Sequence, residues 1–104
     1  MWKANFTNVT MTRDDYGVEL PFRIKNVTFG IGDQLQMRIS KNGTVILELT
    51  FSTIIDNTIY LVLTQEQSSM LPVGRYVYSL DWYKDGVFMD NLIQNARFIV
   101  EDKV

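Results

Sequence analysis

Residues 34–51, which read QLQMRISKNGTVILELTF, decide the fold class. Leu35, Met37 and Ile39 alternate with polar residues, which is the period of a strand that buries one face. Asn42-Gly43 is a strong signal for a tight hairpin turn. After this turn, apolar residues recur at every second position from Val45 to Phe51. The stretch therefore predicts two antiparallel strands joined by a hairpin.

The same alternation continues on both sides of this hairpin, in residues 18–25, 59–63, 76–83 and 96–100. Pro21 cannot donate a backbone hydrogen bond, so the first of these segments is expected at a sheet edge. Residues 5–12 alternate imperfectly and are interpreted as a partly exposed strand. Residues 87–95 fit neither the helical nor the strand period, and we interpret them as a strand with a bulge.

A short helical turn is expected near residues 65–71. Thr64 and Gln67 have the spacing of a capping box, and Pro72 is expected to stop the helix. About seven or eight strands, separated by turns roughly every 8 to 12 residues, are typical of a sandwich or barrel. We therefore predict one all-β domain over residues 1–104, an antiparallel β-sandwich of immunoglobulin-like or jelly-roll-like type.

Composition narrows the class of function. Ten basic and twelve acidic residues give a net charge of −2, without the basic cluster that nucleic acid or an anionic membrane requires. The chain has no histidine and no cysteine, which excludes Ser-His triads and thiol nucleophiles and removes the commonest zinc ligands. No signal peptide is visible, and no apolar run approaches the roughly 18 residues of a membrane-spanning helix. We expect a domain that is not an enzyme and has no cofactor or metal.

Carboxylates are the remaining candidates for chemistry. A catalytic acid pair is conceivable among Asp14, Asp15, Glu48, Asp81, Asp85 and Asp90, but carboxylates in turns and on outward strand faces are usually only solvated. A calcium site at Asp14, Asp15 and Asp33 lacks the spacing of an EF-hand loop. Gly30 and Gly32 lack the lysine and the helix of a phosphate loop, so we interpret them as a turn into the next strand.

Outward residues define the expected contact surface. Alternation places Tyr76, Tyr78 and Trp82 on the core face and Tyr83 on the other. The candidate contact surface comprises the outward apolar and aromatic residues Tyr60, Val62, Tyr83, Ile46 and Ile99.

The C-terminal part carries a more specific order of motifs. Leu63-Thr64-Gln65-Glu66 precedes the helical turn, residues 71–80 read LPVGRYVYSL, and Asp85-Gly86 and Phe98-Ile99-Val100 follow. This order resembles the β-sandwich modules of phage tails and baseplates, such as the N-terminal domain of baseplate upper proteins in phages of Gram-positive bacteria. Residues 12–15, TRDD, are similar to the threonine, arginine, glycine, aspartate start of that family, although Asp14 stands where glycine is usual.

The resemblance implies a virion structural module, located in the phage tail or, during assembly, in the bacterial host cytoplasm. Its partners would be other tail or baseplate proteins or copies of itself, and no catalytic residue transfers. An alternative is a module that binds a host-surface glycan through exposed Tyr83, Tyr60 or Trp2. An immunoglobulin-like adhesion domain is a further possibility, weakened by the absent Cys-Trp-Cys pattern.

Overall fold

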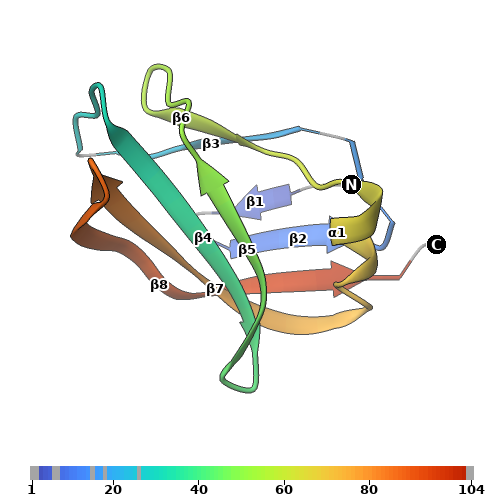
Figure 1. The fold of residues 1–104 in the computed structure, drawn as a ribbon. Coiled ribbons are helices and arrows are strands. Elements are labelled where there is room, and N and C mark those ends of the chain that lie inside the picture. Colours follow the sequence, from blue (N-terminus) through green and yellow to red (C-terminus); the bar gives the residue numbers. More distant parts are fainter. Residues whose placement is uncertain (1–2, 6–7, 15, 18, 26, 103–104) are drawn as a thin grey trace.

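The computed structural model describes residues 3–5, 8–14, 16–17, 19–25 and 27–102. The described residues form eight strands and one short helix (Figure 1). In chain order these are β1 (Lys3–Asn5), β2 (Asn8–Thr12), β3 (Leu20–Arg23), β4 (Asp33–Lys41), β5 (Thr44–Phe51), β6 (Thr58–Leu61), α1 (Gln65–Ser69), β7 (Gly74–Lys84) and β8 (Val87–Glu101). The all-β prediction is confirmed.

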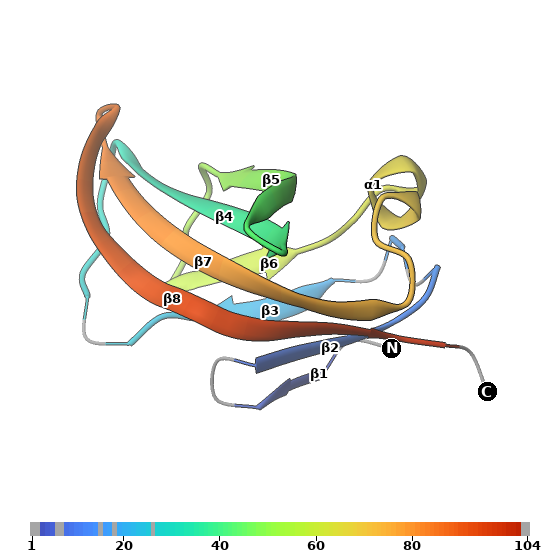
Figure 2. The same cartoon turned by 90° about the horizontal axis from the view of Figure 1, so that it is seen from below.

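The strands make two sheets. One has six strands in the order β1-β2-β8-β7-β4-β5, and the other pairs β3 with β6. Figure 2 shows β7 and β8 as two long bent ribbons that run side by side. The two sheets share one core, since Phe22 of β3 meets Tyr78 of β7 edge to face with ring centroids 6.3 Å apart. The immunoglobulin-like or jelly-roll-like sandwich type stays a prediction.

The period-2 alternation correctly identified the buried face of β4, whereas Val45, expected on the core face of β5, is exposed. In β4, Leu35, Met37 and Ile39 are fully buried, whereas the residues between them are not. The hairpin after β4 turns at Asn42 and Gly43, which both have positive φ as a tight hairpin requires. Further core side chains come from both sheets and the segment around α1: Val9, Met11, Leu20, Ile24, Ile59, Leu61, Leu63, Leu71, Tyr76, Leu80, Phe98 and Val100.

The prediction of a wholly antiparallel fold is wrong in one place. β2 pairs with β8 in parallel, with Val9 beside Phe98 and Met11 beside Val100. A parallel pair needs a long connection, and here the rest of the fold lies between the two strands. No local signal in residues 5–12 distinguishes this partner from an antiparallel one. That segment also contains two strands, because β1 folds back onto β2 with Lys3 opposite Thr10.

Two further boundaries differ from the sequence prediction. Residues 87–101 form one continuous strand, and shifts of register against β7 confirm that it carries bulges. The capping box is present, since the Thr64 hydroxyl accepts from Gln67 N and the Gln67 side chain accepts from Thr64 N. However, α1 ends at Ser69, before Pro72, because Met70 N bonds back to Gln67 O as a C-cap. Val18, the expected start of a strand, lies outside the described residues.

In the described part of the chain, no helix has the length and apolarity to cross a membrane.

Candidate interaction surface

The outer face of the six-stranded sheet carries a polar network centred on Arg38. Register places Arg38 on β4 next to Ser79 on β7 and Glu48 on β5. Its guanidinium donates to Asp81 Oδ2 and, over 2.7 Å, to Gln36 Oε1. A hydrogen bond to the Tyr83 hydroxyl is the main cause that raises the pKa of Arg38. The Arg38 guanidinium is thus surrounded by acceptors from β4, β5 and β7.

Asp81 is the buried partner in this network. It is 8% exposed, and its second carboxylate oxygen accepts from Asn91 Nδ2 over 2.7 Å. A buried carboxylate is costly unless it is paired and hydrogen-bonded, and both conditions hold here. Its oxygens are occupied by Arg38 and Asn91, so the arrangement braces β4, β7 and β8 against one another.

The other carboxylate candidates are not brought together. Asp33 is 5% exposed, and it accepts hydrogen bonds from Gly30 N and Trp82 Nε1. The bond from Gly30, followed by that from Trp82, lowers the pKa of Asp33. Asp14 Oδ2 lies 3.8 Å from Arg13 Nε, and Asp15 lies outside the described residues. Within the described ranges, no group of three potential metal-ligating side chains gathers.

An apolar tip lies where β7 turns into β8. We define the tip as Ile31, Val87, Phe88 and Met89, whose exposed fractions are 100%, 63%, 54% and 46%. Phe88 lies opposite Tyr83 and Asp90 opposite Trp82, so Met89 is the extra residue of a bulge. A bulge breaks the in-out alternation of a strand. Three consecutive apolar side chains consequently face solvent.

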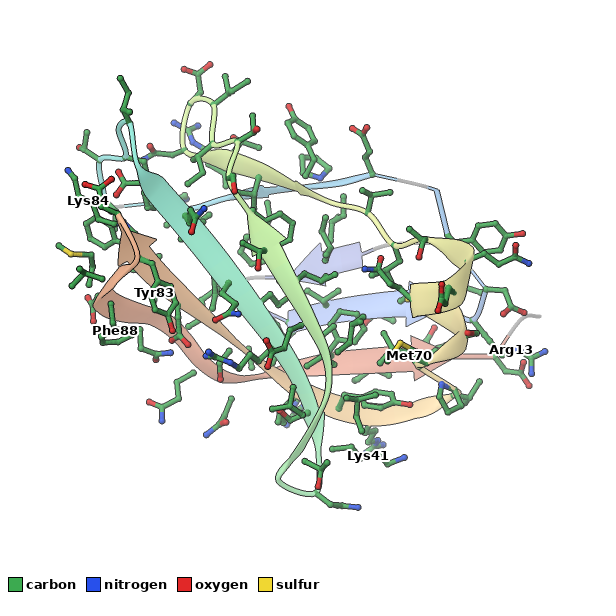
Figure 3. All side chains as sticks on the ribbon, in the orientation of Figure 1. Arg13, Lys41, Met70, Tyr83, Lys84 and Phe88 are labelled. Atoms are coloured by element: carbon green, nitrogen blue, oxygen red, sulfur yellow. The ribbon has the colours of Figure 1, made fainter. Side chains whose placement is uncertain are left out.

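Neighbouring contacts hold the tip in place. The ring of Phe88 meets Tyr83 edge to face, with centroids 5.7 Å apart, and Figure 3 shows both labelled side chains at the same end of the sheet. The loop that carries Ile31 is tied to the hairpin turn, because Asp85 N donates to Gly32 O over 3.0 Å. Gly30 and Gly32 therefore belong to a turn, as the sequence predicted. This turn places Ile31 beside the β7–β8 hairpin.

The edge of the large sheet is also open. In the described part of the structure, β5 pairs with β4 on one side and has no strand on the other. A free edge presents unpaired backbone donors and acceptors to any added strand. Glu48, at the middle of β5, is the one charged residue of this strand.

The predicted contact residues do not form one surface. Tyr60 and Val62 are 50% and 43% exposed, but they belong to β6 and the residues just after it, away from the six-stranded sheet. Tyr83 is half-buried on the outer face, between Arg38 and Phe88. Ile99 is half-buried on β8. Tyr60 and Tyr83 thus do not make a common aromatic platform, and Trp2 lies outside the described residues.

Ile46 was predicted to point outward, and this is wrong. It is half-buried and packs against the core. The register of β5 against β4 shifts between Ile39 and Ser40, which pair with Leu47 and Val45 respectively, so Ile46 is the extra residue of a bulge. Simple alternation cannot anticipate such a shift. The same limitation hid the tip, because residues 87–89 fit no period.

No protein-family model, curated protein sequence or solved structure matches this chain.

Proposed function

We propose that this domain is a non-enzymatic assembly module of the β-sandwich kind that works through protein–protein contacts. Following the resemblance of its C-terminal motifs, we place it in the tail or baseplate of a phage or prophage. The contact surface that we assign is the apolar tip, and its preferred partner is a second copy of the chain. The observation that carries the proposal is the exposed run of Val87, Phe88 and Met89 beside Ile31.

Exposed apolar side chains such as those of the tip are unfavourable in water when the domain is isolated. Single exposed apolar residues are common, but a run of three next to a fully exposed isoleucine is unusual without a partner. The tip is also ordered by the Asp85–Gly32 hydrogen bond and by the Tyr83–Phe88 ring contact. Ordered side chains lose less conformational entropy on binding, which favours association.

The polar network next to the tip suits a supporting role. Arg38 and Asp81 fix the strands beneath Tyr83, and Tyr83 in turn supports Phe88. A rigid aromatic anchor on a braced sheet is typical of residues that contribute most to protein interfaces. The open edge of β5 offers a second, backbone-mediated contact to neighbours in a larger assembly.

Sedimentation velocity across a wide range of protein concentration tests the proposal. The wild-type chain should form a concentration-dependent oligomer, and the double variant Phe88→Ser with Met89→Ser should stay monomeric. Val62→Ser is the matched control, because it removes a comparably exposed apolar side chain outside the tip. Circular dichroism must show that all three proteins are folded.

A strictly monomeric wild-type protein at high concentration, with no binding to phage tail or baseplate proteins, would refute the proposal. So would association that Val62→Ser abolishes and the double variant leaves intact.

A further inference from the structure

A second feature of the outer face lies at the other end of the β7–β8 pair. It is a shallow hollow of about 380 Å³, lined by Ser40, Lys41, Asn42, Arg75, Tyr76, Val77, Arg97 and Ile99. Figure 3 shows Lys41 far from the tip residue Phe88. The volume falls within the range of small-molecule sites, roughly 300–1,000 Å³.

The charge of this hollow opposes that of the whole chain. Three of the ten basic residues line it and no carboxylate does, although the net charge is −2. Arg75 lies opposite Ile99, and Val77 lies opposite Arg97. The two arginines are therefore diagonal neighbours on adjacent strands, at a separation that long side chains can bridge.

Neither arginine has an ion-pair partner among the residues that the structure describes. Ion pairs between described residues involve Arg13 and Arg38, and neither Arg75 nor Arg97 takes part in one. Two like charges on the same face of adjacent strands repel each other. Arg38, by contrast, has Asp81 and Glu48 beside it on the same sheet. Arg75 and Arg97 thus form no ion pair among the described residues, although Glu101 lies on the same face of β8, two residues beyond Ile99.

Lys41 adds a positioned cation at the rim. Its Nζ lies 5.2 Å from the ring centroid of Tyr76, within reach of a cation–π contact. The Tyr76 hydroxyl donates to Pro72 O over 2.6 Å, which fixes the ring. Gly74 leaves space for this ammonium, because a Cβ at that position would lie 3.0 Å from Lys41 Nζ.

The remaining lining suits a ligand larger than a bare ion. Val77 and Ile99 lie between the two arginines in the strand pairing and supply apolar surface. Ser40 and Asn42 supply a hydroxyl and an amide that can bond to neutral polar groups.

We propose that this hollow binds a phosphate or sulfate ester, with the tetrahedral oxyanion held between Arg75 and Arg97. The planar guanidinium fork donates paired hydrogen bonds to such oxyanions, and two forks can share one group. Lys41 strengthens the local field, while Val77 and Ile99 contact the organic part of the ester. This site shares no residue with the tip, so ester binding does not depend on the proposed assembly function.

A titration followed by ¹H–¹⁵N NMR, which includes the arginine side-chain Nε–H signals, tests the site at constant ionic strength. The probes are inorganic phosphate, inorganic sulfate, glucose 6-phosphate, glucose 6-sulfate and uncharged glucose. Saturable shifts should centre on Arg75 and Arg97 with either ester and be absent with glucose. Each ester should bind more tightly than its inorganic ion, and the tighter ester identifies the ligand class.

Variants separate this site from general charge attraction. Arg75→Gln and Arg97→Gln should each weaken binding about tenfold, since each loses a charge-assisted hydrogen bond. Arg23→Gln, an exposed arginine on the two-stranded sheet, should leave affinity unchanged. The Phe88→Ser and Met89→Ser double variant should also bind normally. Unsaturable shifts, equal weakening by Arg23→Gln, or inorganic ions that bind as tightly as the esters would overturn the proposal.

Discussion

Trp82 Nε1 donates a 2.8 Å hydrogen bond to Asp33 Oδ1, which ties the start of β4 to the end of β7 across 49 residues of chain. The other oxygen of Asp33 accepts from Gly30 N, and Phe29 meets the Trp82 ring edge to face at 5.5 Å. One buried carboxylate thus fixes both the indole and the loop that carries Ile31.

We expect Asp33→Asn to lower the free energy of unfolding by about 1–3 kcal/mol at neutral pH. The carboxylate accepts one hydrogen bond on each oxygen, from Gly30 N and from Trp82 Nε1, whereas the amide has one acceptor oxygen and no charge. The hydrogen bonds lower the pKa of Asp33, so its contribution is present above the ordinary value of 3.8 and is lost as the pH falls below it. Urea denaturation at several pH values should show the two proteins converging in acid. Glu19→Gln, at an exposed carboxylate, is the control. A difference that does not depend on pH would contradict the assignment.

Gly32 and Gly30 provide a matched pair within one loop. Gly32 has φ +89, and a Cβ there would lie 2.3 Å from Asp85 Oδ1, whereas a Cβ at Gly30 meets nothing within 4 Å. Gly32→Ala should therefore destabilise the fold by about 1–3 kcal/mol, mainly through backbone strain at the positive φ, together with displacement of the Asp85 carboxylate. Gly30→Ala should have little effect. Thermal unfolding of both variants checks this, and equal losses would show that the turn does not constrain Gly32.

Buried tyrosines predict loss of stability in alkali. Burial raises the pKa of Tyr78, and of Tyr76 to a smaller extent, above the ordinary value of 10.0. The unfolded chain then loses these protons first, so stability declines as the pH rises past about 10. Tyr78→Phe should make this decline shallower, and Tyr60→Phe, at an exposed ring, should not. The slope of unfolding free energy against pH is the measurement, and identical slopes in all three proteins would reject the explanation.

Ser68 offers a stabilising substitution. It is 2% exposed, and its hydroxyl is the one buried side-chain polar atom of the described residues without a hydrogen-bond partner. Ser68→Ala removes an unpaired polar group and improves helix propensity, so we expect a gain of up to about 1 kcal/mol. Ser69→Ala is the contrast, because the Ser69 hydroxyl donates to Glu66 O over 2.6 Å. A clear loss of stability in Ser68→Ala would show that the hydroxyl is satisfied.

Much of the fold could be predicted from the sequence because burial on one face forces period-2 alternation. Leu35, Met37 and Ile39 illustrate this, and the turn chemistry at Asn42-Gly43 placed the hairpin between β4 and β5. The parallel partner of β2 could not be predicted, since pairing between distant strands leaves no local pattern. The capping box could be predicted, because Thr64 and Gln67 lie only three residues apart in the sequence.

The candidate surfaces were harder to predict because bulges decide them. One bulge turns Ile46 inward, and another exposes Met89 beside Phe88. The Arg75 and Arg97 pair is equally hidden in the sequence, because the residues become neighbours only when β7 and β8 pair. Strand alternation could show Tyr83 facing outward, but not that Phe88 and Arg38 would hold it.

The parallel pairing of β2 with β8 also constrains the order in which the chain can fold. Val9 of β2 and Phe98 of β8 are paired and fully buried, although most of the chain lies between them in the sequence. β2 therefore cannot pair with β8 until β8 has been synthesised. During translation the β4–β5 hairpin can form early, while the apolar side chains of β2 remain in water. High contact order of this kind slows folding toward the range of milliseconds to seconds. Until β2 pairs with β8, its apolar side chains are therefore accessible to chaperones and to mispairing with other chains.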